Sequence, residues 1–144
     1  MPARLDQANH ITLDGFPMDR PVSIKGVLLI DRQVVLLKNS RNEWELPGGR
    51  TDPGETHAQT LAREFAEELS LAVSISNPID SYVFEVIPGR HVNIVTYGCI
   101  LAGDFVPRLS EEHSEHCLWP LDRLSEVNLP DGYRRSVEKW ANAV

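Results

Sequence analysis

The sequence has little of what a disulfide-stabilised or membrane-spanning protein needs. Only two of its 144 residues are cysteines, Cys99 and Cys117. Their spacing matches no metal-binding pair, and we interpret both as ordinary buried thiols. The apolar runs, such as residues 27–30, end far short of the roughly 20 residues that cross a bilayer. The sequence therefore predicts a soluble protein with neither a disulfide framework nor a membrane partner.

Positive charge is also scarce. Lys and Arg number 14 against 21 Asp and Glu, which gives a formal net charge of −7. Such a chain offers no broad cationic surface for long nucleic acids, but it suits a protein that recruits divalent cations. Residues 1–7 lack the apolar core of a secretion signal, so we expect a cytoplasmic location. The sequence does not fix the oligomeric state, and a homodimer stays open.

Apolar residues are present in the amount that one core requires. They make up 42% of the chain, and a chain of this length buries roughly 68–70% of its unfolded surface when it folds as one unit. No segment is low in complexity and no period repeats, while Gly and Pro are scattered as turn residues instead of being gathered in a linker. We predict a single domain over residues 1–144.

Hydrophobic patterning predicts a mixed α/β (α+β) fold. Two strands joined by a tight turn at Asp31-Arg32 are expected first, and Pro88-Gly89 is expected to join a later hairpin. A helix should begin after the N-cap Thr56 and run to Leu69. The expected strands are 22–30, 33–38, 43–46, 79–87, 91–101 and 116–119, and the last helix is 131–143. A mixed sheet between helices on both faces would bury these apolar surfaces.

The first predicted helix carries three closely spaced carboxylates, Glu64, Glu67 and Glu68. At 100° per residue, Glu67 and Glu68 lie about 60° and 40° to either side of Glu64. Like charges at this spacing destabilise a helix by roughly 0.2–0.5 kcal/mol per pair. A cation among them would remove that cost, and oxygen-only ligands suit Mg²⁺ or Mn²⁺. The alternative is that the three glutamates form a solvated helix face.

The residues before this helix favour the metal interpretation. Gly48 and Gly49 follow a predicted strand, and a glycine backbone can approach a phosphate closely. Arg63 can pair with Glu67 at a spacing of four residues and orient it. Strand, glycine pair and acidic helix are therefore expected to form one site.

Together these residues resemble the Nudix box, which here runs from Gly49 to Leu71. The matching positions are Gly49, Glu55, Arg63, Glu64, Phe65, Glu67, Glu68 and Leu71. Residues 44–49 are similar to the usual lead-in of the family, and residues 118–124 resemble its later segment. One position departs from the pattern, because Ser70 stands where the family has glycine.

The resemblance implies a Nudix-like α/β/α sandwich and a Mg²⁺-dependent or Mn²⁺-dependent pyrophosphohydrolase. Such an enzyme cleaves a phosphoanhydride bond in a small nucleoside diphosphate derivative, such as ADP-ribose or another nucleotide sugar, by attack of water. The implied metal ligands are Glu64, Glu67, Glu68 and the carbonyl of Gly48. Glu55 and Arg63 would support the loop and these ligands. We assign Gly48, Gly49 and Trp44 to substrate binding, although a strand tryptophan is more often a core residue.

A general base is also implied, and several acidic residues could serve. The base is either Glu64 or a residue of the acidic loop before the late strand. Among the loop residues Glu111, Glu112 and Glu115 we favour Glu112, against the alternative that this loop is only a solvated acidic segment. The histidines at 57, 113 and 116 receive no role.

Two other functions stay open. One is a (d)NTP pyrophosphatase that cleans the nucleotide pool, and the other is a non-catalytic nucleotide-binding module. Pro88-Gly89 falls where subgroups that act on ADP-ribose tend to have a proline, but a simple hairpin turn explains it equally.

Overall fold

The computed structural model describes residues 21–144. The expectations for residues 1–7, and for a domain that includes residues 1–20, lie outside this part of the chain. Within residues 21–144, neither α-helix is long and apolar enough to cross a membrane.

Within the described residues, seven strands form one mixed sheet. They are β1 (Val22–Ile30), β2 (Gln33–Lys38), β3 (Trp44–Glu45), β4 (Gly48–Arg50), β5 (Val73–Ile87), β6 (Arg90–Leu101) and β7 (Glu115–Pro120). The central order is β3-β2-β1-β6-β5, with β4 paired to β1 and β7 paired to β2. Strands β1 and β6 run parallel, and the other pairs are antiparallel.

Strand β1 changes its partner along its length, and this change positions the site. Its end pairs with β2 through Leu29 and Ile30. The expected hairpin is confirmed there, since Asp31 and Arg32 both have positive φ, as the favoured two-residue turn requires. The beginning of β1 pairs instead with β4, where Lys25 lies opposite Gly48. The glycine pair is thereby built into the sheet.

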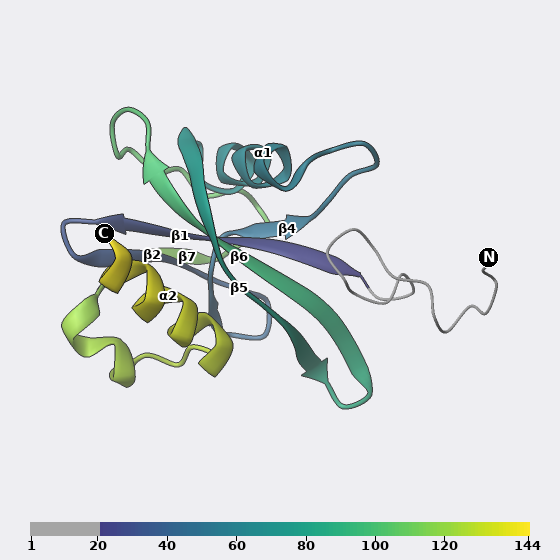
Figure 1. The fold of residues 1–144 in the computed structure, drawn as a ribbon. Helices are drawn as coiled ribbons and strands as arrows, with labels where there is room; N and C mark the ends of the chain where they lie inside the picture. The colour runs from purple at the N-terminus through teal and green to yellow at the C-terminus, as the bar shows by residue number, and fades with distance from the viewer. Residues whose placement is uncertain (1–20) are drawn as a thin grey trace.

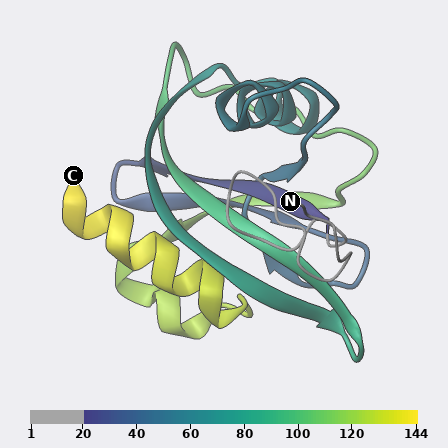
Figure 2. The ribbon, with the colours of Figure 1, turned by 45° about the vertical axis from the view of Figure 1, so that its right-hand side comes forward.

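Helices cover the two faces of the sheet, which confirms the predicted α/β/α sandwich (Figures 1 and 2). Helix α1 (His57–Leu69) packs its buried Leu61, Phe65 and Leu69 into one core cluster. Helix α2 (Asp131–Ala143) follows a 3₁₀ helix, η2 (Leu121–Glu126), and belongs to the other core cluster. Thr56 caps α1 as predicted, in a reciprocal capping box with Gln59.

Four sequence-based expectations need correction. The strand expected at 43–46 is reduced to β3, and Gly48–Arg50 is a strand of its own instead of a loop. Strand β5 begins at Val73, six residues before the expected start. Its first half contains polar residues and Pro78, and the register with β6 shifts at Pro78. The local sequence is therefore a weak β former, and pairing with β6 makes it a strand nonetheless. Cys99 is buried as expected, but Cys117 is only partly buried.

The end of α1 supports a stability prediction. Ser70 is left-handed, with φ 56° and ψ 34°, and its N–H and that of Leu71 bond the carbonyls of Ala66 and Phe65. Glycine adopts this conformation without the steric cost of a side chain. We expect Ser70→Gly to raise the free energy of unfolding by about 1 kcal/mol, measured by urea denaturation. Turnover should change little, and a large loss of activity would contradict the assignment of Ser70 to helix termination alone.

Candidate active site

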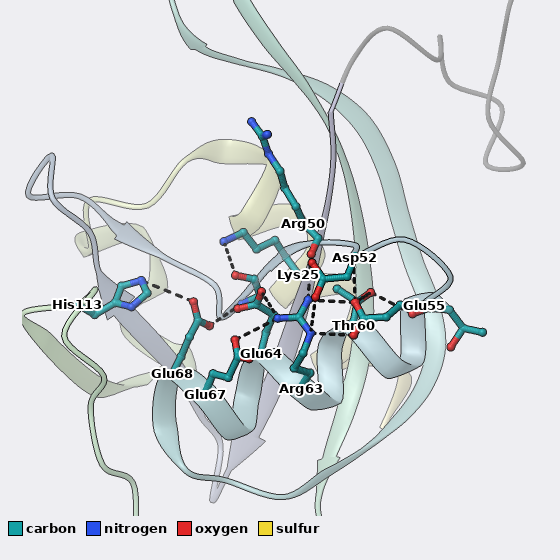
Figure 3. A network of polar contacts seen from close by, with 12 residues as sticks. Lys25, Arg50, Asp52, Glu55, Thr60, Arg63, Glu64, Glu67, Glu68 and His113 are labelled. Carbon is teal, nitrogen blue, oxygen red and sulfur yellow. Dashed lines mark hydrogen bonds and ion pairs between the residues drawn. The ribbon is translucent and has the colours of Figure 1, made fainter.

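Arg63 of α1 organises one end of the acidic cluster. Its Nε and Nη2 donate to the two carboxylate oxygens of Glu55, over 2.7 and 3.0 Å. Its Nη1 donates to Glu64 over 3.2 Å and to Glu67 over 3.0 Å. Nη2 also reaches the carbonyl of Arg50 on β4, over 3.1 Å. One guanidinium therefore ties together the loop before α1, strand β4 and two of the three helix glutamates that are predicted metal ligands (Figure 3).

Glu55 is held ionised in this arrangement. The hydrogen bonds from Arg63 are the main cause that lowers the pKa of Glu55 to about 2, and the backbone N–H of Asp52 and the hydroxyl of Thr60 add to it. These contacts are of the kind that the supporting role implied for Glu55 and Arg63 requires. Neither side chain has to touch a substrate in order to hold the loop and the ligands in place.

We expect Arg63→Lys to lower kcat by about 10–100-fold, as loss of a group that orients metal ligands does. A lysine ammonium cannot reproduce the forked contacts of a guanidinium to three carboxylates. Steady-state kinetics on the metal-loaded enzyme would measure the loss. Arg123→Lys is the matched control, because Arg123 is an exposed arginine paired with Glu126 on η2. Equal activity of the two variants would show that Arg63 does not position the ligands.

Glu64 lies against the backbone of Gly49. A Cβ atom built on Gly49 would come within 2.7 Å of the Glu64 carboxyl carbon, and closer still to one carboxylate oxygen. Only glycine leaves room for this side chain, which is a local reason for the residue type at position 49. Glu64 is largely buried, and burial raises its pKa above the ordinary value despite the neighbouring Arg63.

Glu68 is the most buried of the three helix carboxylates, with 5% of its side chain exposed. Its Oε1 accepts a hydrogen bond from the backbone N–H of Gly48, over 2.9 Å. Burial raises the pKa of Glu68 to about 7, since the nearby positive groups only partly offset the cost of burying a charge. The carboxylate therefore lies in a place where additional positive charge would be strongly favourable.

A second group of charged side chains lies behind Glu68, and sequence reasoning missed it. Nε2 of His113 is 2.9 Å from Oε2 of Glu45 and 3.9 Å from Oε2 of Glu68. Nζ of Lys25 is 4.0 Å from Oε2 of Glu45 and donates to the Gly48 carbonyl over 3.5 Å. Figure 3 shows the network running from Glu55 at one end to His113 at the other. His113, to which the sequence analysis assigned no role, is thus a buried member of the site.

The charges in this second group are mutually stabilised. Burial raises the pKa of Glu45, but hydrogen bonds from His113 and Asn39 and the charge of Lys25 outweigh burial and lower it to about 2. Burial alone would lower the pKa of Lys25, yet the Tyr133 hydroxyl and the carboxylates of Glu45, Glu68 and Glu64 raise it above its ordinary value. Lys25 and Glu45 are therefore both ionised near neutral pH.

Two backbone hydrogen bonds bring His113 to this place. Arg108 and Ser110 donate their N–H groups to the carbonyls of Leu69 and Glu68, over 2.8 and 3.1 Å. The loop between β6 and β7 is thereby fixed to the last turn of α1. Glu112 lies on this loop and is exposed, with its N–H directed to the Ser110 hydroxyl over 3.3 Å.

Glu67 and Trp44 differ from the buried carboxylates in their surroundings. Glu67 has 54% of its side chain exposed and bonds to Arg63. Trp44 is partly buried on β3, packs against the core cluster on the α2 side, and has the ammonium of Lys38 5.1 Å from its ring centre. The structure brings Glu64, Glu68 and both glycines together, and it leaves Trp44 outside that group.

The donor set fits a hard divalent cation. Within residues 21–144, no three His, Cys, Asp or Glu side chains already converge as a finished metal site would. The nearby oxygens are nevertheless those of Glu64, Glu68 and the Gly48 carbonyl, and burial raises the pKa of both carboxyls. A largely buried all-oxygen set whose positive neighbours only partly offset burial matches Mg²⁺ or Mn²⁺ chemistry. Glu67 could join it by turning away from Arg63.

Similar proteins agree with this fold. A solved hydrolase of the NUDIX family from Clostridium perfringens has a TM-score of 0.76 at 15% identity, covering 88% of this chain and 100% of that one. A MutT protein from Methanosarcina mazei has a TM-score of 0.72 at 23% identity, covering 88% and 97%. At this level of identity, the likeness shows the fold.

Relatives in sequence match only short stretches. The 8-oxo-dGTP diphosphatase of Proteus vulgaris is 35% identical over 51 residues, 35% of this chain and 45% of the relative. The mitochondrial ADP-ribose pyrophosphatase of Rattus norvegicus is 43% identical over 54 residues, 38% of this chain and 15% of the relative. The chain thus spans less than half the length of either relative. The NUDIX domain model, in contrast, matches residues 19–140, and this chain belongs to the NUDIX domain family.

Proposed function

We propose that this protein is a Mg²⁺-dependent pyrophosphohydrolase that cleaves a phosphoanhydride bond in a small nucleoside diphosphate derivative, such as ADP-ribose or another nucleotide sugar. The observation that carries the proposal is the buried Glu68 carboxylate, bonded to Gly48 and adjacent to Glu64, with too little positive charge around it. Mn²⁺ would serve in place of Mg²⁺, and a cytoplasmic location stays a prediction.

The ligand residues have distinct tasks in this proposal. Glu64, Glu67, Glu68 and the Gly48 carbonyl would hold the divalent ion, which supplies Lewis acidity toward the phosphate oxygens when bound. Arg63 orients Glu64 and Glu67 through its hydrogen bonds. Gly49 leaves the room that the Glu64 carboxylate occupies, and Gly48 lies against the backbone of Ile24. Both glycines thus lie beside the carboxylates at which a diphosphate would bind.

The reaction needs a proton acceptor for the attacking water. Water adds to phosphorus, the bond between phosphorus and the bridging oxygen breaks, and the water proton passes to a base. We propose Glu112 as this base, because its loop is fixed to the end of α1 next to Glu68. The side chain of Glu112 is exposed, so it can turn toward the attacking water when a substrate binds.

We expect Glu112→Gln to lower kcat by about 100-fold or more, the lower end of the usual contribution of a general base. Glu111→Gln and Glu115→Gln are the matched controls on the same acidic segment, and Glu115 already pairs with Lys38. Steady-state kinetics of the three variants would separate the roles. A loss of less than about tenfold for Glu112→Gln would remove it from the mechanism.

A nucleotide-pool function is the second candidate, and several relatives named as 8-oxo-dGTP diphosphatases favour it. The 8-oxo-dGTP diphosphatase of Proteus vulgaris matches a stretch of this chain about as long as the ADP-ribose pyrophosphatase does. The proline that would hint at ADP-ribose, Pro88, lies with Gly89 in the turn between β5 and β6. That placement agrees with a plain hairpin turn and adds no support for either substrate. A purely binding module is the third candidate, and the presence of all three helix glutamates disfavours it.

A substrate panel tests these candidates. ADP-ribose, other nucleotide sugars, dNTPs, 8-oxo-dGTP and dinucleoside polyphosphates would be incubated with the protein and MgCl₂, and products would be separated by chromatography. We expect release of a nucleoside monophosphate, lost when a chelator replaces MgCl₂, with the highest kcat/KM for a nucleotide sugar. A higher value for a dNTP would select the second candidate, and binding without cleavage would select the third.

A further inference from the structure

Lys25 places a buried ammonium next to the proposed metal site. It is the one charged residue of β1, it lies opposite Gly48 of β4, and only 9% of its side chain is exposed. Its Nζ donates to the carbonyl of Gly48, the peptide oxygen that we propose as a metal ligand. The N–H of the same residue bonds to Glu68. The Lys25 ammonium and the Glu68 carboxylate therefore contact the same residue, Gly48, one at its carbonyl and the other at its N–H.

The charge balance explains what this ammonium can do. The carboxylates of Glu45, Glu64 and Glu68 all act on it electrostatically, and the nearest of their oxygens is 4.0 Å away. Burying a lysine that has no directly bonded carboxylate costs free energy, unless its charge offsets nearby negative charges. Arg63 is already engaged by Glu55, Glu64 and Glu67. Lys25 and His113 are the basic groups beside Glu45 and Glu68 that can offset the negative charge of these carboxylates.

We propose that the Lys25 ammonium acts as a resident cation at the inner end of the metal site. It binds the Gly48 carbonyl and offsets the charge of Glu45, Glu64 and Glu68, so these groups bind a divalent ion more weakly than they would alone. The inference rests on the metal site proposed above. It predicts that the nucleotide-free protein has low metal affinity, and that the negative charge of a bound diphosphate completes the site.

Mn²⁺ binding to the nucleotide-free full chain tests this role without any activity measurement. Titration followed by the electron paramagnetic resonance signal of free Mn²⁺ gives the Kd directly. Lys25→Met keeps the length and removes the charge, and we expect it to tighten Mn²⁺ binding at least about tenfold, since a unit charge a few ångströms away is removed from a poorly solvated site. Lys139→Met removes the same charge from an exposed lysine paired with Asp80, and should bind as the unmodified protein does.

The outcomes distinguish the two proposals. If Lys25→Met folds, as judged by circular dichroism, and binds Mn²⁺ no more tightly than the unmodified protein, the role of Lys25 is wrong while the metal site stands. If the unmodified protein binds no Mn²⁺ and Lys25→Met binds none either, both proposals fail. Lys25→Gln keeps a donor for the Gly48 carbonyl, and it answers the same question should Lys25→Met not fold.

Discussion

Replacing Glu68 by glutamine is expected to lower kcat by at least about 100-fold, while the metal-free protein keeps its fold. The amide is isosteric with the carboxyl, so its oxygen can still accept the hydrogen bond from the Gly48 N–H. It carries no charge to bind a divalent ion, and loss of a direct ligand should cost at least what loss of an orienting group costs. Steady-state kinetics at saturating MgCl₂ would measure the effect.

Although Glu68→Gln should lower kcat, it should not lower the stability of the metal-free protein at alkaline pH. The pKa of Glu68 is raised from 4.5 to about 7, so the folded state holds its proton more tightly than the unfolded state does. The stability of the metal-free protein therefore falls as pH rises from about 4.5 to about 7. Glutamine removes this fall, and at pH 8 the variant should melt no lower than the unmodified protein.

Thermal melts with and without MgCl₂ complete the test. Added MgCl₂ should raise the Tm of the unmodified protein and leave that of Glu68→Gln nearly unchanged, because a ligand stabilises only the state that binds it. Glu138→Gln is the control, since it removes one charge from an exposed position on α2. Full activity of Glu68→Gln would overturn the assignment of this residue as a ligand.

Local patterns predicted the parts of the site that lie together in the sequence. The helix, its cap at Thr56 and the strip of carboxylates all follow from spacing within about fifteen residues. The sandwich could be predicted as well, because alternating apolar segments need a layer on each face of the sheet. The start of β5 could not, since its first residues pair with β6 in spite of their polar composition.

The inner part of the site comes from segments far apart in the sequence. Lys25, Glu45 and His113 lie on β1, on β3 and before β7. Pairing of β1 with β4 places Lys25, pairing of β3 with β2 places Glu45, and the hydrogen bonds of residues 108 and 110 to the end of α1 place His113. One signal was available nonetheless. Lys25 is the sole charged residue of a mainly apolar strand, and a lysine inside a buried strand is seldom left without a partner.

Gly49→Ala is expected to lower activity while leaving the fold intact. The new Cβ would collide with the carboxylate of Glu64, which is the far end of a flexible side chain and can swing away. Gly49 has no positive φ that would strain an alanine, so the free energy of unfolding should change by less than about 1 kcal/mol. Glu64 would be displaced by about 1 Å or more, enough to lower kcat by about 100-fold.

Gly48→Ala supplies the contrast that makes this prediction specific. Gly48 has φ 141°, and a Cβ there would collide with the backbone carbonyl of Ile24, which cannot move without breaking the pairing of β1 and β4. We expect this variant to lose its cooperative thermal transition, whereas Gly49→Ala keeps it and loses turnover. If Gly49→Ala retained full kcat and the Mn²⁺ affinity of the unmodified protein, the position of Glu64 would not matter to the chemistry, and its place among the ligands would have to be given up.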